Sequence, residues 1–154
     1  MVASAAALPR EPDPAPPAAP PAGDAVVLIG NPNVGKSALF GALTGRYVTV
    51  SNYPGTTVEV SSGWATVDGR RRAVVDTPGA ASLLPASEDE RVTRDILLEG
   101  RAGAAVVVGD AKNLERTLLL ALQMAETGLP FVLCLNMMDE AVARGIGVDV
   151  AGLS

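Results

Sequence analysis

One short segment, GNPNVGKS at residues 30–37, limits the folds open to this chain more than any other. It has the spacing G-x-x-x-x-G-K-S, follows the apolar run AVVLI, and precedes ALFGALTG, which has helical spacing. A buried strand, a glycine-rich loop and a helix in this order direct backbone N–H groups at a phosphate. Lys36 would reach the β- and γ-phosphates, and the Ser37 hydroxyl would face Mg²⁺. We therefore predict a phosphate-binding loop rather than a glycine-rich turn with a surface lysine.

Short apolar runs alternate with segments of helical periodicity after this loop. The patterns predict helices at 35–45, 87–100 and 113–128, and strands at 25–30, 58–67, 71–76, 104–110 and 131–136. Strands that alternate with helices predict an α/β fold, in which a mostly parallel sheet with one antiparallel edge hairpin carries helices on both faces. Ligands of such sheets bind at the carboxyl ends of the strands.

Local signals support these boundaries. Asp68-Gly69 predicts the hairpin turn, and Ser87 with Glu90 predicts a capping box at a helix start. In the helix at 113–128, one apolar stripe is predicted to contain Leu114, Leu118, Leu122 and Ala125.

Composition removes several classes of chemistry. Histidine is absent, which excludes imidazole bases and histidine-ligated metals, and the single cysteine excludes a disulfide framework. A net charge of −5 and only 3% aromatic residues argue against nucleic acid as a direct partner. No apolar run approaches the roughly 18–20 residues of a transmembrane helix.

The N-terminal 23 residues differ from the rest. They hold seven of the twelve prolines together with much alanine, which predicts a disordered tail over 1–23 and a folded domain over 24–154. The tail lacks the basic start and apolar core of a signal peptide, so we expect a cytoplasmic protein.

A second motif, DTPG at residues 76–79, ends the predicted strand at 71–76. Asp76 can hold a Mg²⁺-bound water, and the Gly79 amide can meet a γ-phosphate. By itself D-x-P-G is only a turn, but here it follows a phosphate-loop glycine by 46 residues.

A third motif, NMMD at residues 136–139, follows the strand FVLCLN. The Asn136 amide can read a purine edge, while Asp139 can accept hydrogen bonds from guanine N1–H and the 2-amino group, which adenine lacks. The alternative is a helix N-terminus in which Asp139 is a first-turn acid.

The segment SNYPGTTVEV lies where a mobile switch would sit, between the first helix and the second strand. Thr57, next to the strand, is the preferred contact for Mg²⁺ and the γ-phosphate, and Thr56 is the second choice. An ordinary turn at Pro54-Gly55 would explain the same residues without a nucleotide.

These motifs in this order resemble the translation-factor-like P-loop GTPases of the TRAFAC class, which have a Ras-like G domain. Within that class, the chain looks like the cytosolic G domain of the ferrous-iron transporter FeoB family. Four segments carry this resemblance: GNPNVGKSALFGALTG, NYPGTTVE, DTPGAASLLPASEDERVTRDILLEG and the segment from DAKNLERTLLLALQ to NMMDEA. NMMD in place of Asn-Lys-x-Asp favours that family. The resemblance runs from about Val26 to Ser154.

The resemblance implies a GTPase that slowly hydrolyses GTP to GDP and phosphate with Mg²⁺ and regulates Fe²⁺ uptake. It implies a membrane permease portion as partner and a place at the cytoplasmic face of the inner membrane. In that family a further strand and helix, a helical domain and a permease follow, so we expect a G domain that is incomplete at its C-terminus. Two alternatives are an Era-like ribosome- or RNA-associated GTPase and a guanine-nucleotide sensor that hardly hydrolyses GTP.

The resemblance also implies an unusual catalytic device. Ala80 stands where Ras-like enzymes carry the glutamine that orients the attacking water. Asn33 stands where potassium-activated members carry an asparagine ligand to K⁺, with carbonyl oxygens around 53–56 as further ligands. The alternative is that Asn33 only satisfies backbone groups of its own loop.

The predicted site follows from these motifs. Lys36, Thr57 and Asn33 are assigned to catalysis. Ser37, Thr57 and Asp76 are assigned to Mg²⁺, and Asn33 to K⁺. The positions predicted to contact GTP or GDP are Gly30, Asn31, Pro32, Asn33, Val34, Gly35, Lys36, Ser37, Ala38, Gly55, Thr56, Thr57, Asp76, Thr77, Pro78, Gly79, Asn136, Met137, Met138 and Asp139.

Overall fold

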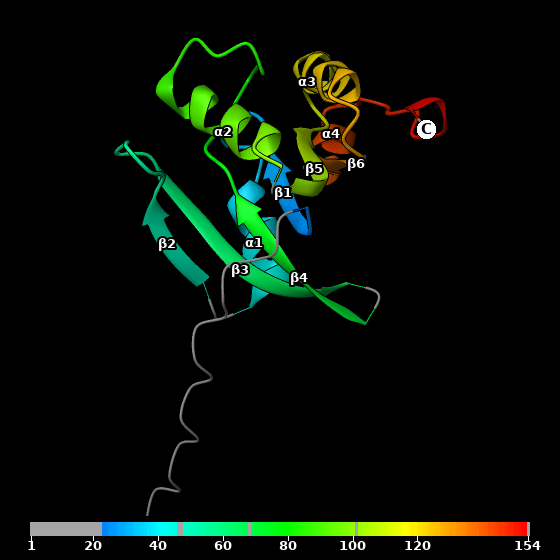
Figure 1. Ribbon diagram of the computed structural model, residues 1–154. Helices are drawn as coiled ribbons and strands as arrows, with labels where there is room; N and C mark the ends of the chain where they lie inside the picture. Colours follow the sequence, from blue (N-terminus) through cyan, green and yellow to red (C-terminus); the bar gives the residue numbers. More distant parts are fainter. Residues whose placement is uncertain (1–22, 46–47, 68, 101, 154) are drawn as a thin grey trace, which may run out of the picture.

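The apolar run AVVLI forms β1 (Ala25–Ile29), an interior strand of a six-stranded sheet in the computed structural model (Figure 1). The structure describes residues 23–45, 48–67, 69–100 and 102–153. The predicted tail therefore lies outside the described residues except for Gly23, as does Asp68 of the predicted hairpin turn. The other strands are β2 (Val48–Asn52), β3 (Glu59–Val67), β4 (Arg70–Asp76), β5 (Ala102–Asp110) and β6 (Phe131–Asn136).

The sheet has the order β2-β3-β4-β1-β5-β6. β4, β1, β5 and β6 run parallel, whereas β3 is antiparallel to both β2 and β4. This confirms the α/β fold with a mostly parallel sheet and an antiparallel edge. β2 was not predicted: its sequence VTVSN alternates valines with polar residues over only five positions, and all five are exposed, so neither face of the strand packs into the core.

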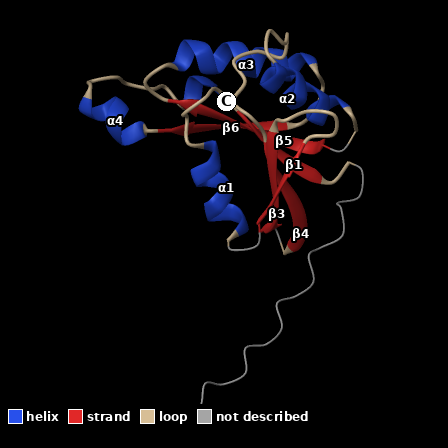
Figure 2. Ribbon diagram, turned by 90° about the vertical axis from the view of Figure 1, so that its left-hand side faces the viewer, coloured by secondary structure: helices blue, strands red, loops and turns tan. Residues whose placement is uncertain are grey.

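Helices cover both faces of the sheet (Figure 2). They are α1 (Lys36–Thr44), α2 (Glu88–Leu98), α3 (Leu114–Glu126) and the short α4 (Met138–Ala143), and a 3₁₀ turn follows at Ala151–Leu153. Side chains alternate along β1, so Val27 and Ile29 join a core with α2 and α3, while Leu28 packs with Phe40 of α1 on the other face. The three predicted helices and five predicted strands agree with the structure to within two residues at each end.

The apolar stripe predicted on α3 was wrong for two of its four residues, since only Leu114 and Leu118 are half-buried. Leu122 is 65% exposed and Ala125 is also exposed. The buried residues are instead Thr117, Leu120, Ala121 and Met124. The run LLLAL places leucines all round the helix, so its sequence does not define one face. The contact with β5 decides the rotation, because a Cβ at Gly109 would lie 2.0 Å from Thr117 Cγ2, and the missing side chain lets the helix approach.

Glu90 of the α2 capping box also makes hydrogen bonds to the segment that precedes the helix. The Glu90 backbone N–H donates to Ser87 Oγ (3.2 Å), as predicted. The Glu90 carboxylate accepts from the backbone N–H groups of Ala86 (2.9 Å) and Ala81 (3.1 Å), and thereby holds the segment after DTPG. The hydrogen bond from Ala86 is the largest cause that lowers the pKa of Glu90.

We expect Glu90→Gln to lower the free energy of unfolding by about 1 kcal/mol at pH 7, since a neutral amide accepts these bonds less strongly. A lowered folded-state pKa gives stability that is present above the unfolded pKa and lost as pH falls through the folded pKa. The difference between variant and wild type in urea denaturation should therefore shrink in acid. Asp89→Asn is the control, because no hydrogen bond in the described part of the chain uses its side chain. An equal loss in both variants would contradict the role of Glu90.

Candidate functional site

The phosphate loop connects β1 to α1 at the sheet edge where the parallel strands end. Asn33 and Gly35 both have positive φ, of 62° and 91°. A Cβ at Gly30 would lie 2.2 Å from the Val108 carbonyl oxygen, and one at Gly35 would lie 2.2 Å from Asn136 Nδ2. The loop therefore fits between β5 and the end of β6 only with glycine at both positions.

Lys36 is the first residue of α1 and is 8% exposed. Burial lowers the pKa of Lys36, whereas the charge of Asp76 raises it. Burial of an ammonium group is costly in the absence of an anion. The Asp76 charge offsets only part of that cost, since the pKa of Lys36 stays lowered, and a polyphosphate at the N-terminus of α1 would supply a further anion.

Asp76 ends β4 beside the start of α1. Its Oδ2 accepts a hydrogen bond from Ser37 Oγ (2.8 Å). Its Oδ1 is buried and has no hydrogen-bond partner within the described residues. A buried carboxylate oxygen without a partner, next to a serine hydroxyl, is a donor set suited to Mg²⁺ or its bound water.

The rest of DTPG is fastened to the strands and the phosphate loop. Thr77 donates from its hydroxyl (2.8 Å) and its N–H (3.3 Å) to the Leu28 carbonyl. The Ala80 N–H donates to the Gly30 carbonyl (3.0 Å), and a Cβ at Gly79 would lie 2.8 Å from Pro32 Cγ. The Thr77 hydroxyl is therefore already hydrogen-bonded within the fold.

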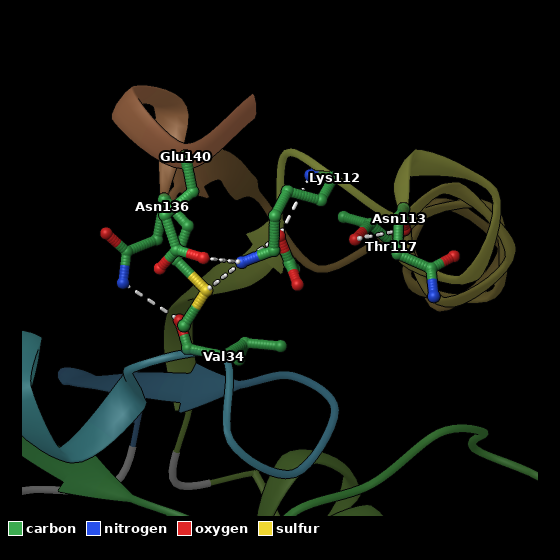
Figure 3. A network of polar contacts seen from close by, with 8 residues as sticks. Val34, Lys112, Asn113, Thr117, Asn136 and Glu140 are labelled. Atoms are coloured by element: carbon green, nitrogen blue, oxygen red, sulfur yellow. Dashed lines mark hydrogen bonds and ion pairs between the residues drawn. The ribbon is translucent and has the colours of Figure 1, made fainter. Parts of the chain in front are cut away.

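The NMMD segment reaches the phosphate loop from β6 (Figure 3). Asn136 Nδ2 donates to the Val34 carbonyl (2.9 Å), and the Asn136 carbonyl accepts from the Ala111 N–H (3.0 Å). Met137 adopts the left-handed conformation, and Asp139 is exposed in the first turn of α4. Asp139 is thus a first-turn acid, as the alternative had it, and its carboxylate is also accessible to a ligand.

The segment at 53–58 forms a tight turn between β2 and β3. The Thr56 hydroxyl donates to the Tyr53 carbonyl (2.9 Å) and accepts from the Val58 N–H (3.2 Å), whereas Thr57 is exposed. Ser61 pairs with Asp76, so the turn lies beyond the strand end that carries Asp76. Neither threonine is hydrogen-bonded to the phosphate loop within the described residues. Because the Thr56 hydroxyl is already hydrogen-bonded within this turn, Thr57 is favoured as the switch residue. This role remains a prediction.

Two further polar residues near the site, Lys112 and Gln123, were missed, and Glu90 was predicted only as part of a capping box. Lys112 contacts Met137 and Glu140, Glu90 holds the segment after DTPG, and Gln123 of α3 accepts from the Leu83 N–H (2.7 Å). Lys112 had a signal in the sequence: it is one of only two lysines and follows a strand that ends at the site. The partners of Gln123, Leu83 and Ser82, are 40 and 41 residues away in the chain, and no local pattern reveals them.

The parallel sheet, the glycine-rich loop at the start of α1 and the acidic residue at the end of β4 define a P-loop nucleotide-binding protein of the GTPase type. Residues 24–154 match the family described as ferrous iron transport protein B. The chain belongs to this family, FeoB. The Era-like alternative is therefore not the family found.

Individual relatives agree with this family assignment. The Fe(2+) transporter FeoB of Salmonella typhimurium (strain LT2) is 42% identical over 131 residues, which cover 82% of this chain and 17% of the relative. The crystal structure of the T. maritima FeoB G domain is 40% identical with a TM-score of 0.78 and covers 84% of this chain and 79% of that one. The cytosolic domain of T. maritima FeoB in its GMPPNP form is 41% identical with a TM-score of 0.79, covering 84% and 52%.

The chain thus spans about a sixth of the length of the Salmonella transporter it matches, 17%. Among the helices of the described residues, none has the length and apolar character needed to cross a bilayer.

Proposed function

We propose that this chain binds guanine nucleotides and hydrolyses GTP to GDP and phosphate. The observation that carries the proposal is the buried, unpartnered Oδ1 of Asp76, whose Oδ2 accepts from Ser37 beside the desolvated Lys36. A buried carboxylate oxygen that has no hydrogen-bond partner among the described residues suits a metal–triphosphate complex. FeoB structures described as GDP and GMPPNP forms support the choice of nucleotide.

Ser37 and Asp76 would hold Mg²⁺, and Thr57 would join them when the turn at 53–58 closes over the nucleotide. Bound there, Mg²⁺ would neutralise charge on the β- and γ-phosphates. Lys36 would bind the same phosphates, and the backbone N–H groups of the loop would surround them. The Gly79 amide would reach the γ-phosphate.

Guanine would be selected by Asp139, whose exposed carboxylate faces no competing partner in the described part of the chain. Asn136 would hold the base-binding segment on the phosphate loop through the Val34 carbonyl while its amide lies beside the purine edge. This arrangement connects base recognition directly to the phosphate cradle.

In the whole protein, we place this domain at the cytoplasmic face of a membrane, where it regulates Fe²⁺ transport by a permease portion. The support is the name of the relatives, Fe(2+) transporter, and the description of similar structures as cytosolic domains.

Catalysis would be assisted by K⁺ at Asn33. Ala80 cannot orient a water molecule, and the chain has no histidine. Asn33 is exposed, and its side chain makes no hydrogen bond to its own loop within the described residues, contrary to the alternative role. The Tyr53 carbonyl is occupied by Thr56, so a K⁺ site that includes it would require the turn to open. A fixed monovalent cation there would stabilise developing negative charge.

The test is single-turnover hydrolysis of GTP by the full chain with saturating Mg²⁺, in KCl and in NaCl at equal ionic strength. We expect slow turnover that is about tenfold faster in K⁺, and loss of that difference in Asn33→Ala with GDP binding retained. Equal rates in the two salts would remove the K⁺ role. Tight GTP binding without phosphate release in either salt would instead identify a nucleotide sensor.

A further inference from the structure

A lysine from the turn after β5 reaches the NMMD segment, which is proposed to bind guanine. Lys112 lies two residues beyond the end of β5, and its Nζ is 2.8 Å from Glu140 Oε2, 3.1 Å from Met137 Sδ and 3.4 Å from Asp110 Oδ1 (Figure 3). Its side chain is only 13% exposed. The amine thus connects the end of β5 with the first turn of α4.

The turn that carries Lys112 is itself well defined. The Lys112 N–H donates to Asp110 Oδ1 (2.9 Å), and the Asn113 N–H donates to the Asp110 carbonyl (2.9 Å). The adjacent Ala111 N–H donates to the Asn136 carbonyl. Because β5 and β6 pair as far as Asp110 and Asn136, this turn and the NMMD segment begin side by side.

Met137 needs support from outside its own segment. It has φ 59° and ψ 33°, a left-handed conformation that is costly for a residue with a long side chain. Such a residue persists only where its surroundings hold it. Two residues of the turn at 110–112 contact this segment: Lys112 Nζ touches both Met137 Sδ and Glu140 Oε2, and the Ala111 N–H donates to the Asn136 backbone carbonyl.

Lys112 contacts the residue at which other guanine motifs carry a lysine. The common guanine motif Asn-Lys-x-Asp carries its lysine directly after the asparagine, where this chain has Met137. Here an ammonium group contacts the same residue from the turn that follows β5. The hydrogen bond with Glu140 is the largest cause that raises the pKa of Lys112, so the amine is charged at neutral pH.

We propose that Lys112 is a positioning residue for guanine recognition: it holds the Met137–Glu140 segment so that Asp139 faces the base. Without its charge, the carboxylates of Asp110 and Glu140 would face each other across the gap and push the first turn of α4 away from β5. Asp139, within that turn, would lose its alignment. This inference rests on the proposed guanine binding and adds the residue that sets its geometry.

The experiment measures the affinities of GDP and ADP for the full chain by competition with a fluorescent GDP. We expect Lys112→Met to weaken GDP binding about five- to tenfold and to reduce the GDP-to-ADP affinity ratio by the same factor. ADP, which depends on the phosphate loop, should bind within about twofold of wild type. Lys112→Arg keeps the charge and should restore most of the ratio. Arg144→Met removes an exposed cation just after α4 and is the matched control, expected to leave the ratio unchanged.

Glu140→Gln weakens the same contact from its exposed side, where folding is least at risk, and should lower the ratio about twofold. An unchanged ratio in both Lys112→Met and Glu140→Gln, with wild type preferring GDP, overturns the inference alone. Equal loss of GDP and ADP affinity overturns it too, because it indicates general destabilisation. A wild-type chain that prefers neither nucleotide overturns the proposed function and this inference together.

Discussion

Lys36→Ala is expected to weaken GTP binding by about 100-fold or more and to abolish hydrolysis. The side chain is 8% exposed at the start of α1, beside Asp76, so a bound polyphosphate meets its charge in a largely desolvated place. Alanine there also removes the positive charge that interacts with Asp76, which would further disfavour a triphosphate. Titration calorimetry with a non-hydrolysable GTP analogue and single-turnover hydrolysis would measure both effects.

Thr57→Ala is the informative comparison for Lys36→Ala. Lys36 serves both nucleotide states, whereas a switch threonine meets only the γ-phosphate and its Mg²⁺. The Thr57 variant should therefore bind GDP normally and lose turnover. Hydrolysis at the wild-type rate would assign the role to Thr56 or to no threonine, and retention of tight GTP binding by Lys36→Ala would remove the phosphate-loop assignment itself.

Asp139→Ala should weaken GDP binding by about tenfold or more, since one charge-assisted pair with guanine is lost. ADP binding should hardly change, because adenine offers no donor to this carboxylate. Measuring both affinities with fluorescent analogues separates loss of base recognition from loss of the phosphate site. Glu126→Ala removes an exposed carboxylate at the end of α3 and should change neither affinity. Equal GDP and ADP affinities in the wild type would contradict the guanine assignment at the outset.

Much of the fold could be derived from local sequence. β1, the glycine-rich loop and α1 are consecutive in the chain, and each has a strong local signal: an apolar run, a fixed glycine spacing and a helical period. DTPG and NMMD could be placed at one edge of the sheet because they follow strands, and parallel strands end together. The phosphate loop, Asp76 and Asn136 do lie at that edge, linked by hydrogen bonds.

The misplaced stripe on α3 shows where local pattern fails. Four leucines within residues 118–122 supply apolar side chains in several directions, so hydrophobicity alone cannot choose the buried face. The choice depends on Gly109, which belongs to another element and lets Thr117 approach β5. β2 was not predicted because its alternation of valines with polar residues covers only five positions, and as an edge strand it buries neither face.

The sequence by itself thus determined the chemistry of the site: a lysine, a serine, an aspartate and an Asn-x-x-Asp, each at the end of a recognisable element. Only the tertiary structure decided how these groups are held. The Thr56 hydroxyl is hydrogen-bonded within its own turn, Gly35 lies against Asn136, and Lys112, just after β5, contacts Met137 of the NMMD segment. The physical reason is that motif residues stand at fixed spacings within short segments, so the sequence shows them directly. Their supporting contacts join residues far apart in the chain, and only the strand order brings those residues together.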